Sequence, residues 1–318
     1  MEHIESWGTN GEHLKRFDFP KDIYRVTAGA GGESILIDGG DEVAIYDCGM
    51  AYCQEGVIQN IKEKLSELGR DRLDKIILSH SHYDHIGALP YILRVWPDAK
   101  VVGGKKLQKV FSSEGARATM KRLGEAARDK YLGEDHHDME ISVDGMRVDI
   151  IVEDGDIIKL GKYDITAIFT PGHTDCSFSY FFKAKDKPSV IFLSESMGVL
   201  ENEEFLHTSI LKSFDDTIDS AKKCKAFNAD FLISSHYGVV PEIIKDRYFD
   251  MYIHFATLEK DFILDLYDKG YGFEEICREY EKKYWNYSRV GAQPIEAFRE
   301  NEGHTIRLIV KTFRNATI

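Results

Sequence analysis

The chain has 318 residues, of which 43% are hydrophobic and 30% are charged, and this composition is typical of a globular protein with a buried core. Its 41 Lys and Arg residues against 54 Asp and Glu residues leave a formal net charge of −13, which repels phosphate backbones and excludes nucleic acid as the expected partner. Five scattered cysteines without CxxC spacing argue against a disulfide framework and against a cysteine-based zinc site.

The first ten residues contain neither a basic segment nor an apolar one, so we expect no signal peptide. No run approaches the ~18 apolar residues that a membrane span requires. We therefore expect a cytoplasmic protein with no membrane partner. Short basic pairs such as Lys105-Lys106 are interpreted as solvated helix faces and do not indicate a basic groove.

Short strands and helices alternate through the first part of the chain. Gly39-Gly40 marks the turn of a hairpin, and apolar residues at helical or alternating spacing mark the other elements. In chain order, the predicted elements are strands over 34–38 and 43–47, a helix over 54–68, a strand over 74–79, a helix over 86–96 and a strand that begins at Val101.

A polar, charged insertion follows over about 105–144, and we expect it to lie over the core, as a lid does. It has helical character over 116–130 and an exposed loop at 134–138. Beyond it the pattern is again β-rich, with one helix that Ser213 caps. The predicted elements are strands over 147–152, 156–160, 163–169, 177–182, 190–193 and 231–234, and a helix over 214–227.

After Pro241 the pattern becomes entirely helical, over 242–270, 273–284 and 295–313. We therefore predict a core of residues 1–241 and a helical C-terminal extension, 242–318, packed on that core. The extension is rich in aromatic residues and offers a surface for a homodimer as readily as a roof for a pocket.

The segment HSHYDH, residues 80–85, directly follows a predicted strand and carries four candidate metal ligands. Residues two apart in extended backbone point to the same side, so His80 and His82 can converge on one ion. Asp84 and His85 follow where the chain turns into a helix, and they project to a neighbouring point. Imidazole and carboxylate ligands suit Zn²⁺, and they also suit Fe²⁺ or Mn²⁺.

This segment resembles the HxHxDH signature of the metallo-β-lactamase superfamily. Three other segments resemble markers of the same superfamily, in the same order along the chain: YDCG at 46–49, TPGHT at 170–174 and SHYG at 235–238. The resemblance covers roughly residues 20–240. It implies an α/β fold, the αββα metallo-β-lactamase sandwich, with metals at one edge.

The resemblance also implies a two-metal centre. By position, the implied ligands form two sets: His80, His82 and His173 for one metal, and Asp84, His85 and His236 for the other. The implied cofactors are two divalent metal ions, with zinc favoured and iron or manganese as alternatives. Asp47 is expected to hydrogen-bond to the ligand loop, and Cys176 is expected to be a small buried side chain.

One position departs from the family's pattern. The superfamily supplies a bridging aspartate in a segment that resembles FxGD, whereas residues 192–195 of this chain read FLSE. Glu195 therefore stands where aspartate is expected, with its carboxylate one methylene further from the backbone. It can bridge the two metals, bind one of them, or lie outside the ligand set, and the sequence leaves these alternatives open.

The resemblance implies hydrolysis through a metal-bridged hydroxide that attacks a carbonyl, since two metals roughly 3.5–4 Å apart lower the pKa of a shared water. No GxSxG elbow and no P-loop is present. Asp84 is the predicted catalytic residue for proton transfer. Tyr83 or Tyr237 is a candidate hydrogen-bond donor to the substrate, although apolar packing is the favoured role of each.

The chain length and the C-terminal helices are most similar to the glyoxalase II-like and acyl-CoA thioesterase-like members. The leading hypothesis is therefore a hydrolase of small-molecule thioesters, with acyl-CoA-type thioesters favoured and esters or lactones as the near alternative. Two other classes stay open: a diiron protein that binds O₂ or NO, and a small-molecule phosphodiesterase. Against the diiron class, His82 stands where flavodiiron-type members have a glutamate.

Overall fold

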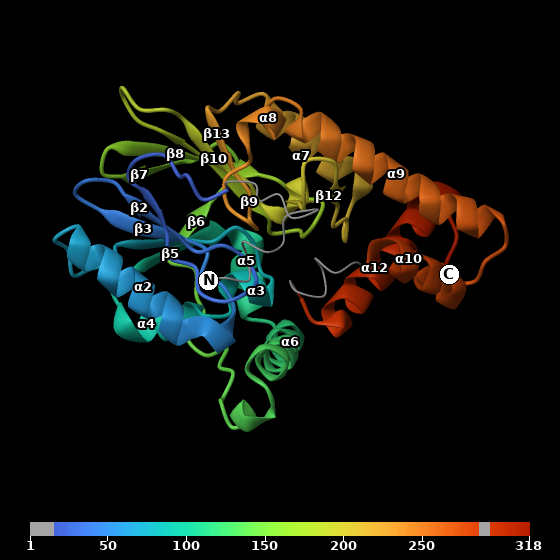
Figure 1. The fold of residues 1–318 in the computed structure, drawn as a ribbon, viewed down its shortest axis with the longest axis horizontal. Coiled ribbons are helices and arrows are strands. Elements are labelled where there is room, and N and C mark those ends of the chain that lie inside the picture. Colours follow the sequence, from blue (N-terminus) through green and yellow to red (C-terminus); the bar gives the residue numbers. More distant parts are fainter. Residues whose placement is uncertain (1–15, 286–292) are drawn as a thin grey trace.

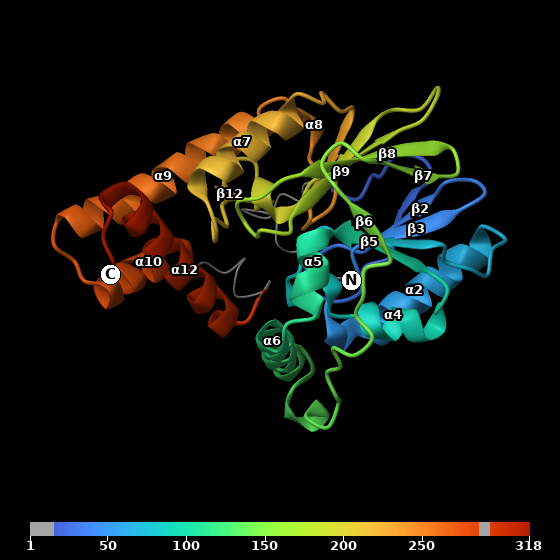
Figure 2. The same ribbon diagram turned by 180° about the vertical axis from the view of Figure 1, so that it is seen from behind.

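The computed structural model describes residues 16–285 and 293–318 of the chain. Within them, two β-sheets face each other and helices cover both outer faces (Figure 1). The helices α2 (Gln54–Glu67) and α4 (Leu89–Val95) lie outside one sheet, and α7 (Phe214–Lys225) and α9 (Tyr248–Asp268) lie outside the other. Figure 2 shows the same layers from behind. This arrangement is the αββα sandwich that the sequence predicts.

The first sheet contains the strands β1 (Ile23–Arg25), β2 (Ile35–Asp38), β3 (Val43–Tyr46), β4 (Lys75–Ile77), β5 (Lys100–Gly104) and β6 (Ile150–Val152). They lie side by side in that order. The strands β2 and β3 form the predicted hairpin, in which Ile35 pairs with Tyr46, and β3 to β6 run parallel to one another. The carboxyl ends of β3 and β4 therefore meet at the same edge of the sheet.

The second sheet contains β7 (Ile157–Leu160), β8 (Tyr163–Phe169), β9 (Phe178–Lys183), β10 (Val190–Phe192) and β13 (Phe231–Ile233). Their order is β13-β10-β9-β8-β7. Because β9 runs antiparallel to both β8 and β10, and β13 runs parallel to β10, the strands β8, β10 and β13 all point the same way. Their carboxyl ends also share one edge.

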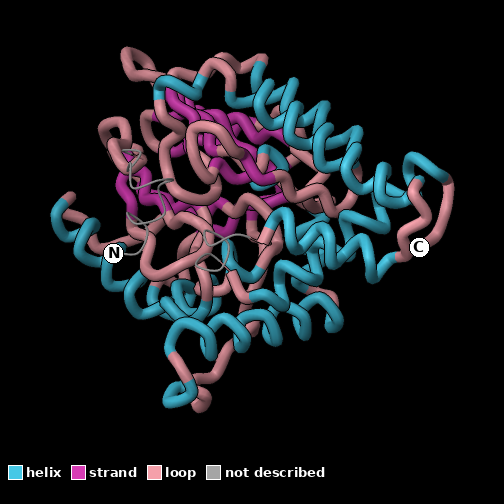
Figure 3. The backbone as a smooth tube through the Cα atoms, turned by 45° about the vertical axis from the view of Figure 1, so that its right-hand side comes forward, coloured by secondary structure: helices cyan, strands magenta, loops and turns pink. Residues whose placement is uncertain are grey.

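The core consists of layers, which Figure 3 shows as stacked strands enclosed by helices. In β3, Val43 and Ile45 belong to the apolar cluster that includes α2, whereas Ala44 and Tyr46 belong to the cluster between the two sheets. All four residues are buried, because side chains alternate between the faces of a strand and both faces of this sheet are covered. This explains the continuous apolar runs of the predicted strands.

The predicted helix over 86–96 is wrong in its boundaries. The chain instead forms α3 (Tyr83–Ile86) and α4, separated at Gly87 and Ala88. A Cβ at Gly87 would lie 2.4 Å from the Tyr83 carbonyl oxygen and 2.6 Å from the Ala51 nitrogen, so the close approach of the Ala51 backbone requires glycine between the two helices. The predicted helix over 242–270 is likewise divided into α8 (Glu242–Lys245) and α9.

The insertion over 105–144 forms α5 (Lys105–Phe111), α6 (Glu114–Leu132) and a 3₁₀ turn, η3 (Glu134–His136), within the segment predicted as an exposed loop. Ser113 caps α6 by accepting a hydrogen bond from the Ala116 amide. Between β10 and α7, the strands β11 (Val199–Leu200) and β12 (Leu206–His207) form a two-residue ladder that is too short to leave a sequence pattern.

The C-terminal extension consists of α8, α9, α10 (Phe273–Tyr284) and α12 (Ile295–Arg314) within the described residues. The first half of α9 packs on the second sheet and α7 through Tyr248 and Tyr252. Its second half joins α10 and α12 in a separate apolar cluster that includes Ile263 and Ile306. Because α9 belongs to both clusters, the division at residue 241 stays a prediction. No helix in the described ranges is long and apolar enough to cross a membrane.

A buried carboxylate lies inside the extension. Glu259 of α9 is 3% exposed and accepts hydrogen bonds from the hydroxyls of Thr208 and Tyr280. Burial raises the pKa of Glu259 to about 7, although the two hydrogen bonds act in the opposite direction. The folded protein thus retains a proton there that the unfolded chain releases at lower pH.

We expect Glu259→Gln to stabilise the protein relative to wild type more at pH 8 than at pH 5. A carboxyl whose pKa is raised on folding loses stability as pH increases from its unfolded to its folded pKa. The difference in unfolding free energy between variant and wild type should therefore change by about 2–3 kcal/mol between these pH values. Urea titrations at both pH values measure it. Asp261→Asn, on the exposed side of α9, is the control, and equal differences at both pH values would contradict the prediction.

Candidate metal centre

The residues that the sequence singles out meet at the edge of the sandwich where the strand ends of both sheets converge. Each lies just beyond a strand: His80 and His82 after β4, Asp84 and His85 in α3, His173 after β8, Glu195 after β10, and His236 after β13. Glu195 begins a 3₁₀ turn, η4 (Glu195–Met197). The structure therefore brings all seven predicted site residues together.

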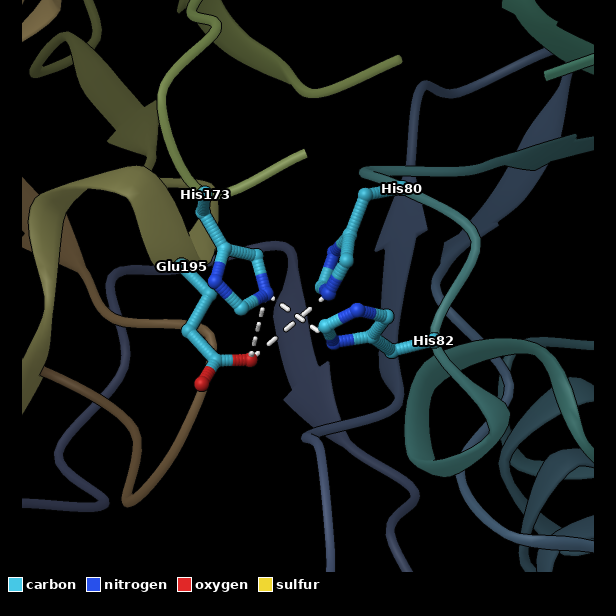
Figure 4. A group of neighbouring side chains, drawn as sticks. All are labelled: His80, His82, His173 and Glu195. Atoms are coloured by element: carbon cyan, nitrogen blue, oxygen red, sulfur yellow. Dashed lines mark hydrogen bonds and ion pairs between the residues drawn. The ribbon is translucent and has the colours of Figure 1, made fainter. Parts of the chain in front are cut away.

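The first group of candidate ligands consists of His80, His82, His173 and Glu195, each of which contributes one atom to a set whose members lie within 4.8 Å of one another. The Nδ1 atom of His82 lies 2.9 Å from Nε2 of His173. The Oε2 atom of Glu195 lies 3.6 Å from Nε2 of His80 and 3.5 Å from Nε2 of His173. In Figure 4 these four side chains, which come from opposite sides of the site, point toward one another.

The second group consists of Asp84, His85, Glu195 and His236. The Nε2 atoms of His85 and His236 lie 3.2 Å apart, and Oδ2 of Asp84 lies 3.5 Å from each of them. The same Oε2 atom of Glu195 lies 3.4 Å from the His85 nitrogen and 3.6 Å from the His236 nitrogen. Glu195 is thus the residue that the two groups share.

Backbone carbonyls fix the orientation of two rings. The Nδ1 atom of His173 lies 2.8 Å from the Ser209 carbonyl oxygen, and Nδ1 of His236 lies 3.1 Å from the Gly31 carbonyl oxygen. A carbonyl oxygen only accepts hydrogen bonds, so each Nδ1 carries the proton and each Nε2 presents a lone pair to the centre. Neither carbonyl leaves a signal in the sequence.

Asp47 holds one histidine of each group. Its carboxylate is fully buried and accepts hydrogen bonds from the Ser79 amide (2.7 Å) and the Ser79 hydroxyl (2.6 Å), and it lies 3.0 Å from Nδ1 of His85. Because the Ser79 hydroxyl donates to Asp47, its oxygen accepts from Nδ1 of His80, 2.8 Å away. The predicted hydrogen-bonding role of Asp47 is confirmed. The role of Ser79 is not predictable from the sequence, since a serine at the end of a strand has no distinctive pattern.

These orientations create a need for positive charge. With its Nδ1 atom protonated, His236 presents its Nε2 lone pair to Nε2 of His85, 3.2 Å away. The Nε2 atom of His80 is buried and has no hydrogen-bond partner within the described residues. Nitrogen and carboxylate donors of this kind suit Zn²⁺, Fe²⁺ or Mn²⁺. The residues present therefore fit a pair of divalent metal ions.

The electrostatic environment keeps most of these groups in the forms that bind metals. Burial lowers the pKa of His80 and of His82 well below that of a free imidazole, so both rings stay neutral. Burial also acts to lower the pKa of His85, but the charge of Asp84 and the Asp47 hydrogen bond raise it well above the usual range. The surrounding histidines, His173 foremost, outweigh burial and hold the pKa of Glu195 well below its usual range.

The turn that carries His173 depends on a glycine. Gly172 has φ +129°, and a Cβ there would lie 2.4 Å from the Thr217 Cβ in α7. The Pro171-Gly172 pair therefore lets the loop lie directly against α7. This close packing fixes the position of His173 relative to β10 and Glu195.

A cavity of about 630 Å³ opens onto both groups, and Asp84, Glu195 and His236 line its floor. Tyr83 and Tyr237 also line it, and both are buried. The walls include residues of α5, α6 and α12, so the insertion and the C-terminal extension both border the cavity. Arg122 of α6 and Glu300 of α12 form an ion pair of 2.6 Å between these two walls. The lid role of the insertion stays a prediction.

Cys176 has the small buried environment that the sequence predicts. Its side chain lines the cavity and is 3% exposed, and its Sγ lies 3.3 Å from the Thr174 hydroxyl. Within the described residues it belongs to neither group of candidate ligands.

Comparisons with known proteins match the chain to one superfamily and to several of its members. A family model described as the metallo-beta-lactamase superfamily matches residues 29–236. A metallo-beta-lactamase fold-containing protein of Sulfurisphaera tokodaii is 40% identical over 182 residues, which are 56% of this chain and 66% of that protein. A hydroxyacylglutathione hydrolase of Buchnera aphidicola is 27% identical over 137 residues, which are 43% of this chain and 40% of that protein. The matched regions thus span less than two thirds of these relatives' own length.

A solved structure supports the fold. A HARLDQ-motif mutant of a metallo-beta-lactamase from Cronobacter sakazakii superposes with a TM-score of 0.55 at 18% identity, covering 79% of this chain and 98% of that one. At this level of identity the likeness concerns the fold alone.

The shared position of Glu195 leads to a first prediction for this site. We expect Glu195→Gln to reduce bound metal from about two ions per chain toward one, because a neutral amide is a weak ligand for either group. Glu195→Asp, which restores the superfamily's usual residue, should reduce it less. Elemental analysis after dialysis measures the stoichiometry. Glu201→Gln, which changes another cavity-lining carboxylate outside both groups, is the control, and full metal content in Glu195→Gln would exclude a ligand role.

A second prediction concerns Asp47. We expect Asp47→Asn to weaken metal binding by roughly 10–100-fold, since the hydrogen bonds that orient His80 and His85 lose their charged acceptor. Asparagine tolerates the backbone of this position, where φ is +52°, so the fold should persist. Competition with a chromophoric chelator gives the affinity and circular dichroism checks the fold. An unchanged affinity would show that the network does not support the centre.

Proposed function

Because the chain belongs to the metallo-β-lactamase superfamily, we propose that it is a two-metal hydrolase of small acyl thioesters, with acyl-CoA-type thioesters favoured over esters and lactones. The observation that carries this proposal is the position of Glu195, whose Oε2 atom lies within 3.6 Å of ring nitrogens from both ligand groups. A carboxylate oxygen shared in this way supports one dinuclear centre over two separate sites.

Two divalent metal ions, when bound, would make a water nucleophilic at neutral pH and polarise the carbonyl under attack. The five histidines, Asp84 and Glu195 would hold them. The Asp84 carboxylate lies beside His85 and His236 and also lines the cavity, so it can take a proton from the attacking water. Four of these histidines, His80, His85, His173 and His236, are buried, which limits the access of bulk water from the protein interior.

The cavity supports a substrate with an apolar part. Its volume, about 630 Å³, lies in the usual range for small-molecule sites. Val110, Met120, Leu123 and Ala297 line it and provide an apolar surface against which an acyl chain can pack. The similarity to a hydroxyacylglutathione hydrolase, whose named substrate is a thioester, supports the thioester class.

The redox state of the cysteines supports the proposed cytoplasmic location. All five are free, and four of them are buried. Disulfides are rare in reducing compartments, so an unpaired set of this kind is expected there.

We expect the metal-loaded protein to hydrolyse acyl-CoA or acyl-glutathione faster than a lactone or bis(p-nitrophenyl) phosphate, in parallel assays. His82→Ala should lower metal content and reduce turnover at least a hundredfold, on the order of the loss of a catalytic metal site. The control is His254→Ala, which changes an exposed histidine of α9 that belongs to neither ligand group. Turnover of the phosphodiester alone would contradict the thioesterase. Bound iron with an O₂- or NO-sensitive spectrum and no hydrolysis would indicate the diiron class.

A further inference from the structure

Positive charge gathers at the cavity in a chain whose formal net charge is −13. Three lysines line the cavity: Lys106 and Lys109 of α5, and Lys212 in the loop before α7. All three are exposed. Lys106 and Lys109 are three residues apart in a helix, so their side chains share one face of α5.

Lys212 is fixed beside the metal centre. Its backbone amide donates a hydrogen bond of 2.9 Å to the Gly172 carbonyl oxygen, immediately before His173. Lys106 lies near the same loop, since its amine is 3.9 Å from the carboxylate of Asp175. Lys106 and Lys212 therefore both lie beside the 172–175 loop.

The carboxylates that line the cavity leave two of these lysines without a partner. Asp84 and Glu195 face the metal groups, Glu201 is buried, and Asp175 faces Lys106. Within residues 16–285 and 293–318, neither the Lys109 amine nor the Lys212 amine takes part in an ion pair or a side-chain hydrogen bond. Their charges are available to a ligand.

Other residues that line the cavity have different chemistry. Val110 of α5, Met120 and Leu123 of α6, and Ala297 of α12 are apolar. The cavity thus combines cationic and apolar lining residues with the candidate metal groups. A matching substrate carries both an apolar group and an anionic group.

We propose that Lys106, Lys109 and Lys212 select acyl substrates that carry an anionic group, a carboxylate or a phosphate, over neutral acyl compounds. This inference rests on the proposed function, because it assigns the substrate class of the same site. The ion pairs form at an exposed cavity wall, where each is modest and screened by salt, so selection comes from the three charges together.

The test compares thioesters that share one acyl group and differ in the thiol half, which carries a carboxylate, a phosphate or a neutral amide. We expect Lys109→Ala and Lys212→Ala each to reduce the preference for the anionic over the neutral thioester by about 3–10-fold, mainly through KM. The preference of the wild type should also fall as salt rises from 50 to 500 mM. The phosphate and carboxylate arms show which anion the lysines favour.

Lys105→Ala is the matched control, because Lys105 is an exposed neighbour in α5 that does not line the cavity. It should keep the wild-type preference. Equal turnover of anionic and neutral thioesters by the wild type, or the same preference in all variants, would overturn the inference while leaving the hydrolase proposal intact.

A binding measurement separates the two proposals. Isothermal titration calorimetry with non-hydrolysable thioethers, each bearing the carboxylate, the phosphate or the amide, reports recognition without turnover. Tighter binding of the anionic thioethers that depends on Lys109 and Lys212 would support the inference even if no thioester were hydrolysed. Equal affinity for the anionic and neutral thioethers would overturn it.

Discussion

Five imidazole rings and two carboxylates converge at the inner end of the cavity, and the electrostatic interactions among them constrain the rest of the structure. Ring nitrogens of neighbouring histidines lie within hydrogen-bond distance of each other, as the Nε2 atoms of His85 and His236 do at 3.2 Å. Buried polar atoms without partners are costly. The arrangement is stable because the remaining ring nitrogens bond to Asp47, Ser79 and the backbone carbonyls of Gly31 and Ser209.

The two sheets make this convergence possible. The parallel strands β3 and β4 of one sheet, and β8, β10 and β13 of the other, end at a common edge, so short loops suffice to bring distant residues together. The apolar layer between the sheets holds these ends at a fixed separation. The packing of the two sheets therefore sets the positions of the strand ends. The loops that follow these strands need only to supply histidine and carboxylate side chains at those positions.

The local part of this site is predictable from the sequence, whereas the long-range part is not. The spacing of His80, His82, Asp84 and His85 follows from strand and helix geometry, but His173 and His236 gain meaning only from the resemblance to a family. The place of Glu195 depends on where β10 ends relative to both ligand groups, which no local pattern encodes. The sequence around Lys106 indicates only a solvated helix face, because the cavity beside α5 exists only after α6 and α12 pack around it.

The helix α9 connects two apolar clusters that otherwise lie in different parts of the protein. Its 21 residues extend about 30 Å, and they contribute at one end to the apolar cluster over the second sheet and at the other to the cluster formed with α10 and α12. A helix nucleates at a cost and then propagates as a unit, so melting one end weakens the other. The sandwich and the C-terminal helices should therefore unfold in a single cooperative transition, and the cavity wall that α12 provides should persist for as long as the sandwich itself.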